Sequence, residues 1–299
     1  MSEASLNGGK APPAISFEFF PPKTDAQVAM LEDSVARLAC FRPAYVSVTY
    51  GAGGSTQERS RGAVQQMLRW GLRTAAHVTC AGASCDALDE TIGWFRDAGV
   101  TRFVALRGDP PGGLSEPYIP HPLGFGDTAD LVRALKRAGS REVSVAAYPE
   151  RHPQSPDWDT EMDVLKRKVD AGADRAITQF FFDNDLYEAY VERVGRAGID
   201  VPVVPGIMPV HRFPSVCSFA SRCGASIPES LAQRFEGLDP SEETHGLVAA
   251  AVVTEQMADL IARGVDAFHI YTLNRAELTE TICRVCGIAP VDANACRAA

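Results

Sequence analysis

Ionisable side chains interrupt or follow several short apolar segments of this chain. Glu18 lies within the apolar run Phe17-Glu18-Phe19-Phe20. Because such neighbours exclude water, we expect its carboxyl group to be partly desolvated, which raises the pKa of a carboxylic acid and suits it to donate a proton. The alternative for a glutamate in this position is a side chain that points to solvent or pairs with a lysine.

Other polar side chains occur where later apolar segments end. They are Thr49 and Tyr50, His77, Arg107-Gly108-Asp109, Tyr148 and His152, Gln179, and Tyr271 with Asn274-Arg275. This mixture suits acid–base chemistry or the binding of an anion. A metal-dependent lyase or hydrolase would use Glu18, His77, Asp109 and His152, although the sequence has no HxH or HxxxH pair to support a metal. The two histidines could also be hydrogen-bonded groups of the core or of a loop.

The elements that would position these side chains alternate regularly. Short segments rich in β-branched and aromatic residues predict strands, and longer segments with helical periodicity follow most of them. The predicted strands are Ile15–Phe20, Tyr45–Thr49, Arg73–Thr79, Arg102–Leu106, Val143–Ala147, Arg175–Phe181, Val201–Pro205 and Ala267–Tyr271. The predicted helices include Asp25–Ala39, Thr56–Trp70, Cys85–Ala98, Ala129–Ala138, Glu161–Ala171 and Thr244–Arg263.

Eight strands in this order predict a single (β/α)8 TIM barrel over residues 15–289, between flexible tails at residues 1–14 and 290–299. A doubly wound open sheet is the rival fold. It usually has a glycine-rich turn after its first strand, where this chain has Pro21-Pro22-Lys23. The loops after the strands of a barrel converge on one face, so we expect the polar side chains above to meet there.

The amino-acid composition limits the classes of partner expected for such a barrel. The net charge of -9, from 38 acidic and 29 basic residues, disfavours binding to nucleic acid or to an anionic membrane surface. No apolar run approaches the roughly 20 residues that cross a bilayer, and the N-terminus does not resemble a secretory signal, so we expect a cytoplasmic protein. The eight cysteines are then expected as thiols, and a single CxxC at Cys283 and Cys286 is insufficient for a zinc site.

Six motifs of the chain resemble, in order, those of the methylenetetrahydrofolate reductase family. They are ISFEFFPP (15–22), VSVTYG (46–51), ALRGD (105–109), VAAYPE (145–150), ADRAITQFFFD (173–183) and YTLNR (271–275). The resemblance is strongest to the short bacterial form, which lacks a C-terminal regulatory domain. It implies reduction of 5,10-methylenetetrahydrofolate to 5-methyltetrahydrofolate by NADH or NADPH, through bound FAD, in two half-reactions with ping-pong kinetics.

Matching positions give each candidate an implied role. Glu18 corresponds to the general acid that opens the imidazolidine ring of the folate, and Asp109 to an aspartate between flavin and pterin that tunes the flavin. Gln179 corresponds to a residue that contacts folate and nicotinamide in turn. Substrate contacts are implied for Glu18, Asp109, Gln179, Phe219, Tyr271 and Arg275. Flavin contacts are implied for Thr49, Tyr50, Ala52, His77, Arg107, Gly108, Asp109, Thr128, Tyr148, His152, Arg167 and Lys168; the last two would otherwise be interpreted as a solvated helix face.

The chain departs from the family pattern at three places. Gly126-Asp127-Thr128-Ala129 replaces a segment that commonly contains a Tyr-Ala pair, Ser215 replaces a glutamine, and Val164 replaces an asparagine-like residue. Weaker flavin or folate binding would follow. A flavin-free reductase, or a folate- or flavin-binding protein without turnover, therefore stays an alternative. The direction of the reaction, and whether the protein is a monomer or a homo-oligomer, are left open by the sequence.

Overall fold

A computed structural model describes residues 11–50, 54–110 and 116–291, so the predicted flavin contact Ala52 lies outside the described residues. The strands are β1 (Ala14–Phe19), β2 (Tyr45–Val48), β3 (Thr74–Thr79), β4 (Arg102–Leu106), β5 (Glu142–Ala147), β6 (Arg175–Thr178), β7 (Val203–Val204), β8 (Gly206–Ile207) and β9 (Ala267–Tyr271). The helices are α1 (Asp25–Ala39), α2 (Gly54–Arg69), α3 (Cys85–Asp97), α4 (Thr128–Arg137), α5 (Trp158–Asp170), α6 (Asn184–Arg196), α7 (Phe213–Cys223), α8 (Glu229–Phe235), α9 (Glu243–Ala262) and α10 (Glu277–Val285).

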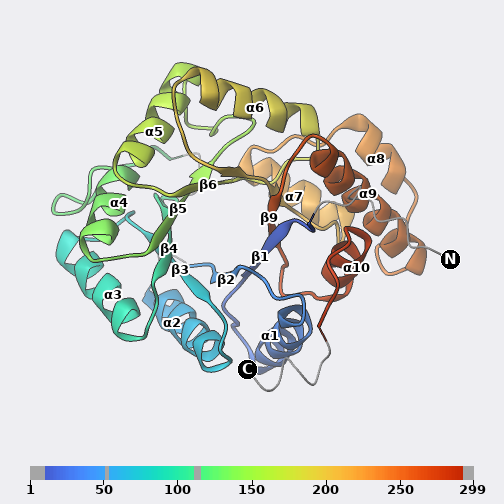
Figure 1. The fold of residues 1–299 in the computed structure, drawn as a ribbon, viewed down its shortest axis with the longest axis horizontal. Helices are drawn as coiled ribbons and strands as arrows, with labels where there is room; N and C mark the ends of the chain where they lie inside the picture. The colour runs from blue at the N-terminus through green and yellow to red at the C-terminus, as the bar shows by residue number, and fades with distance from the viewer. Residues whose placement is uncertain (1–10, 51–53, 111–115, 292–299) are drawn as a thin grey trace.

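The strands form one parallel sheet in the order β7-β6-β5-β4-β3-β2-β1-β9-β8. Only Pro205 separates β7 from β8, and the two segments pair with opposite neighbours, β7 with β6 and β8 with β9. They are therefore two halves of one barrel strand, and their pairing closes the ring inside a layer of helices (Figure 1). The predicted (β/α)8 TIM barrel is confirmed.

The sixth and seventh barrel strands differ most from their predicted ranges. The predicted strand Arg175–Phe181 ends at Thr178, so Gln179 follows the strand instead of lying within it. The backbone N–H of Gly206 donates to the Thr178 hydroxyl at 2.8 Å. A Cβ atom at Gly206 would lie 2.2 Å from the Thr178 carbonyl oxygen, so only glycine allows this approach. The start of β8 therefore packs closely against the end of β6 at the point where the barrel closes.

Side-chain caps fix where the two helices nearest the cationic side chains begin. Asp127 accepts from the N–H of Asp130 at 3.1 Å and starts α4, while Asp157 accepts from the N–H of Thr160 at 2.8 Å and starts α5. Gly139 and Gly172 follow these helices with φ of 83° and 108°. These caps leave Thr128 at the start of α4 and Lys168 in the last turn of α5.

Alternation along β1 separates the core from the site. Phe17 and Phe19 are fully buried in the large cluster formed with the surrounding helices. Ser16 and Glu18, two residues apart, share the opposite face of the strand. In the parallel register, Ser16 lies opposite His269 and Glu18 opposite Tyr271 on β9. The first and last strands therefore bring polar side chains together inside the barrel.

Candidate active site

A cavity of about 1200 Å³ lies where the strands end and their following loops begin. Apart from Ala52, every predicted site residue lines it except Arg275. Arg275 is exposed beside the neighbouring Asn274, which instead ties down the chain: its side-chain amide accepts from the N–H of Phe20 at 2.8 Å and donates to the Phe20 carbonyl at 2.9 Å. A folate contact by Arg275 stays a prediction.

One end of the cavity, which we call the acidic end, is lined by Glu18, Thr49 and His77, with His269 behind Glu18. The Thr49 hydroxyl donates to Glu18 Oε1 at 2.7 Å. His269 Nε2 lies 3.2 Å from Glu18 Oε2, and His77 Nε2 lies 3.6 Å from the same oxygen. The four side chains come from β1, β3, β9 and the end of β2, so the barrel register sets their distances.

The protonation of Glu18 differs from the sequence-based prediction. Burial raises the pKa of its carboxyl group, but the neighbouring His77 and the hydrogen bonds from His269 and Thr49 outweigh burial and lower the pKa to about 2. Burial lowers the pKa of His77. The predicted upward shift of the Glu18 pKa was therefore wrong, because the apolar sequence neighbours of Glu18 point away from it while three polar side chains from other strands face it.

An aromatic wall borders the acidic end. Phe180 and Phe219 stack with ring centroids 5.6 Å apart and an interplanar angle of 15°. The Tyr271 hydroxyl donates to the Thr178 carbonyl at 2.8 Å, which fixes its ring edge-on to Phe180. The side-chain oxygen of Gln179 accepts from the N–H of Phe180 at 3.0 Å, leaving the Gln179 amide protons for another partner. Such a wall suits a flat heteroaromatic ligand.

The other end of the cavity, which we call the cationic end, contains Arg107, His152, Arg167 and Lys168. Lys168 is only 7% exposed and donates to the Ala146 carbonyl at 3.0 Å. Burial lowers the pKa of Lys168 to about 8, while nearby Glu161 acts in the opposite direction. The pKa of His152 falls to about 4 because of burial and the charges of Arg107 and Lys168. These groups are crowded with like charge, which a bound anion would relieve.

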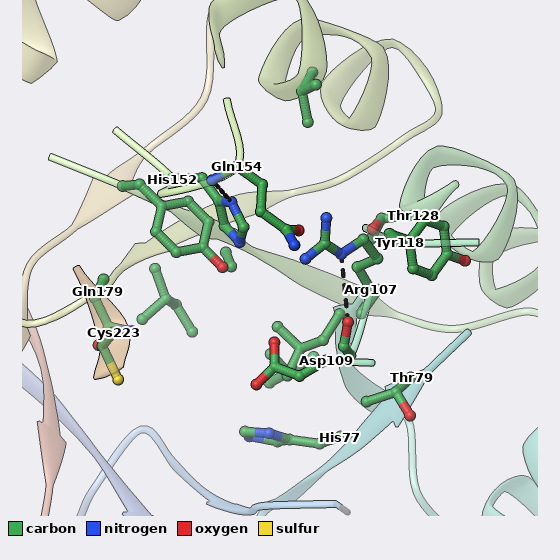
Figure 2. A pocket seen from close by; sticks show the side chains of 18 of the residues that line it. His77, Thr79, Arg107, Asp109, Tyr118, Thr128, His152, Gln154, Gln179 and Cys223 are labelled. Carbon is green, nitrogen blue, oxygen red and sulfur yellow. Dashed lines mark hydrogen bonds between the residues drawn. The ribbon is translucent and has the colours of Figure 1, made fainter. Parts of the chain in front are cut away.

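Arg107 has unused hydrogen-bonding capacity. Its Nη2 atom is buried and has no hydrogen-bond partner, while Nε donates to the Gly108 carbonyl at 3.3 Å. Figure 2 shows Arg107 in the middle of the pocket, with Asp109 on the side of His77 and Tyr118 on the opposite side. The Tyr118 ring centroid is 5.0 Å from the guanidinium carbon. This buried donor, next to Lys168 and His152, is suited to a phosphate oxygen.

Arg167 contributes less to the cationic end than Lys168 does. Its side chain is 55% exposed and is paired with Asp127, the residue that caps α4. The alternative of a solvated helix face therefore holds largely for Arg167, which is exposed, but not for Lys168, which is buried. Both side chains line the cavity.

Several lining residues escaped the sequence analysis. Tyr118, Thr79, Glu161 and Cys223 line the cavity, and His269 supports Glu18 from below without lining it. Glu161 accepts from the backbone N–H of His152 at 3.2 Å. Only Tyr118 had a signal, since it lies in the long segment after the fourth predicted strand. The others lie within elements, where the sequence pattern gives no sign of which side chain reaches a site.

Two kinds of feature are absent from the described residues, namely a metal-binding cluster and a membrane-spanning helix. Across residues 11–50, 54–110 and 116–291, no group of three or more histidine, cysteine, aspartate or glutamate side chains is placed to hold a metal ion. Within the same ranges, no helix is both long and apolar enough to span a membrane.

Comparison with known proteins assigns the chain to a family by its sequence. The family described as "Methylenetetrahydrofolate reductase" matches residues 3–287. The chain belongs to the methylenetetrahydrofolate reductase family. It is 42% identical over 277 residues to the 5,10-methylenetetrahydrofolate reductase of Escherichia coli, which covers 92% of this chain and 91% of the relative. The family resemblance noted from the six motifs is confirmed, and the chain is an enzyme of this family.

One further relative and one solved structure resemble this chain over different shares of their own length. The chain is 34% identical to "Methylenetetrahydrofolate reductase (NADH) 1" of Arabidopsis thaliana over 87% of this chain but only 46% of that protein. A Clostridium thermocellum protein, described as binding two copies of 5-methyl-5,6,7,8-tetrahydrofolic acid, has a TM-score of 0.62 at 12% identity and covers 92% of this chain and 94% of its own. The second likeness concerns the fold alone.

The three departures of this chain from the family pattern differ in whether they line the cavity. Gly126, Asp127 and Val164 line the cavity, whereas Ser215 is exposed on α7 and does not. The tyrosine that is missing near Asp127 therefore concerns the cationic end, where Tyr118 supplies an aromatic ring from another segment.

Proposed function

We propose that this reductase converts 5,10-methylenetetrahydrofolate to 5-methyltetrahydrofolate with NADH or NADPH, using FAD bound in the cavity. The observation that supports it most is the two-ended cavity, with the buried carboxyl group of Glu18 between two histidines at the acidic end and an unpaired buried guanidinium nitrogen on Arg107 at the cationic end. A pterin and a flavin are flat heterocycles, and FAD in addition carries a pyrophosphate. The aromatic wall beside the acidic end suits the flat ring systems, and the cationic end suits the pyrophosphate.

The residues present fit FAD at the cationic end. Arg107, Lys168 and His152 would contact its pyrophosphate, and Gly108, whose φ of 83° favours glycine, forms part of the lining beside Arg107. Thr49, Tyr50, His77, Thr128 and Tyr148 line the remaining surface available to it. When bound, FAD would carry hydride from the nicotinamide to the folate.

The chain's own side chains would orient the folate and supply the proton. Gln179 and Phe219 would hold first the nicotinamide and then the pterin against the aromatic wall, so that the two substrates use one site in turn and obey ping-pong kinetics. Glu18 would donate a proton to the ring nitrogen that leaves when the imidazolidine ring opens. Asp109 would stabilise the cationic pterin. The same groups serve the reverse reaction, because a forward acid is a reverse base.

The first experiment is an absorption spectrum of the purified protein, followed by anaerobic addition of NADH and then of methylenetetrahydrofolate, with NADPH in a parallel titration. We expect a flavin spectrum that bleaches with the nicotinamide and recovers with the folate. A colourless protein that takes up no added FAD yet still turns over the folate would contradict the flavin, and a flavin that the nicotinamide reduces only when the folate is also present would contradict the ping-pong order.

A further inference from the structure

A row of three buried polar side chains leads from the cavity into the barrel. Glu18 lines the cavity, His269 lies behind it, and Ser16 lies behind His269. Ser16 Oγ is 2.8 Å from His269 Nδ1, and His269 Nε2 is 3.2 Å from Glu18 Oε2. The exposed fractions of the three residues are 8%, 0% and 3% from Glu18 inward, so water does not compete for these contacts.

The contacts of Ser16 determine which imidazole nitrogen carries a proton. Ser16 Oγ also lies 3.3 Å from the Phe268 carbonyl oxygen, which can only accept. A hydroxyl has one proton, so both contacts of Ser16 are hydrogen bonds at once only if it donates to Phe268 and accepts from His269 Nδ1–H. Ser16 therefore favours the imidazole form with a proton on Nδ1.

That form leaves an unshared electron pair on His269 Nε2, which faces Glu18 Oε2. Two acceptors facing each other repel unless a proton lies between them. The other carboxylate oxygen, Oε1, already accepts from the Thr49 hydroxyl at 2.7 Å. Thr49 thus confines the extra proton to the contact between Oε2 and Nε2, and the carboxyl–imidazole pair holds one proton in common.

The other titratable groups around this pair do not compete for the proton. His77 on β3 faces Oε2 at 3.6 Å, and burial lowers its pKa. Tyr45 on β2 stacks on the His269 ring with centroids 6.1 Å apart, and Tyr271 on β9 lies 5.3 Å away. Burial raises the pKa of both tyrosines, so both stay neutral.

A cluster of charged side chains lies next to Tyr45. The Arg175 guanidinium lies 5.8 Å from the Tyr45 ring centroid, and Arg175 is paired with Glu142 at 3.6 Å. Glu142 is also paired with Arg102 at 3.5 Å, so this cluster contains two positive charges and one negative charge.

We propose that His269 and Ser16 are positioning residues that store the proton which Glu18 delivers to the folate. The inference rests on the proposed role of Glu18 as the acid. The proton moves from Nε2 to Oε2 and then to the ring nitrogen. The carbon–nitrogen bond breaks, its electron pair stays on that nitrogen, and the methylene carbon receives the hydride that the reductase activity supplies. Water in the cavity then returns one proton to Glu18, because Glu18 lines the cavity while His269 and Ser16 do not.

The low pKa of the Glu18 carboxyl group agrees with this arrangement. A carboxyl group with a pKa of about 2 would by itself hold almost no proton near neutral pH. A proton stored on the adjacent imidazole is available without a raised carboxyl pKa, and it reaches Oε2 when folate binding displaces water from the cavity.

The kinetic test compares Ser16→Ala and His269→Gln with the wild type, measuring the nicotinamide and folate half-reactions separately from about pH 6 to about pH 9. Ser16→Ala weakens the proton-loaded form, so we expect the folate half-reaction to fall about tenfold at the alkaline end and to recover towards acid pH. His269→Gln still donates to Oε2 but carries no extra proton, and we expect a loss of about a hundredfold. The nicotinamide half-reaction should stay within about twofold.

The matched control is His245→Gln. His245 is also a buried histidine, accepts from the N–H of Phe213 at 3.2 Å, and does not line the cavity, so both half-reactions should be unchanged. A loss in Ser16→Ala that is the same at every pH, or one shared by both half-reactions, overturns the storage role. If Glu18→Gln keeps a full folate half-reaction, the proposed function of Glu18 fails. If Glu18→Gln slows that half-reaction but Ser16→Ala shows no pH-dependent loss and His269→Gln stays fully active, the relay alone fails.

A substrate-free measurement tests the same row in the wild-type protein. Nitrogen NMR with isotope-labelled histidine reports which ring nitrogen is protonated. We expect the His269 signal to show a proton on Nδ1 throughout the pH range, and Ser16→Ala to shift it towards the form with a proton on Nε2. An unprotonated Nδ1 in the wild type would show that Ser16 donates to the ring, and would overturn the proposal.

Discussion

The two ends of the cavity are built differently. At the acidic end, Glu18 has partners on both oxygens, supplied by strands that pair in a fixed register. At the cationic end, Arg107 has a buried nitrogen without a partner, and Lys168 loses basicity through burial and like charge. The Glu18 carboxylate is therefore paired within the protein, although both ring nitrogens of the neighbouring His77 lack a hydrogen-bond partner, whereas the cationic end is suited to an anion that supplies the partner missing at Arg107.

The difference predicts that changes at the acidic end affect chemistry and changes at the cationic end affect binding. Glu18→Gln should have the largest effect, slowing the folate half-reaction by roughly a hundredfold to ten-thousandfold, because a positioned acid contributes that much. Flavin reduction by the nicotinamide should continue. Anaerobic stopped-flow absorbance measures the two steps, and an equal fall in both would remove the acid role.

Lys168→Met should have the next largest effect, weakening FAD binding by about tenfold to a hundredfold through loss of a charge-assisted hydrogen bond. The lowered pKa of Lys168 means that its charge is present below pH about 8 and lost above it. FAD affinity of the wild type should therefore fall as pH rises through that value, and Lys168→Met should lack this dependence. Fluorescence titration of the apoprotein measures both, and a parallel pH dependence in the variant would exclude Lys168 as its source.

Asp109→Asn tests the group between the two ends, which lines the cavity beside Arg107 and His77 (Figure 2). Removing its charge should make the flavin easier to reduce by about 30 mV, equal to a tenfold equilibrium change for a two-electron couple. The folate half-reaction should slow about tenfold because the cationic pterin loses a stabilising charge. Spectroelectrochemistry gives the potential, and an unchanged value would contradict the tuning role.

Arg167→Met should have the smallest effect and serves as the matched comparison for Lys168→Met. Arg167 is adjacent in sequence but exposed and paired with Asp127, so solvent screens its charge. We expect FAD affinity to fall only about twofold to threefold, without a change in its pH dependence. A loss as large as that in Lys168→Met would show that exposure is a poor guide to anion binding at this end.

The same contrast explains what could be predicted. The alternation of strands and helices and the polar residues at strand ends are local features of the sequence. Strands β4 and β9 accordingly begin and end at the predicted residues. Strand seven was harder to locate because Pro205 lacks an N–H and divides it into two short segments. Arg275 was grouped with the site because it follows a strand, but the turn at Leu273 and Asn274, with φ of 52° and 56°, leaves Arg275 outside the cavity lining.

The sequence by itself determined the fold class, the family and many of the polar residues that line the cavity, because several of these residues lie at or just after the predicted strand ends. Only the tertiary structure decided the environment of those side chains. Glu18 and His269 are 251 positions apart, and they meet because the first and last strands pair when the barrel closes. Apolar neighbours in the sequence predicted a raised pKa for Glu18, whereas the facing polar groups lower it. A side chain's pKa is set by the groups nearest to it in space, and in a barrel these belong to other strands.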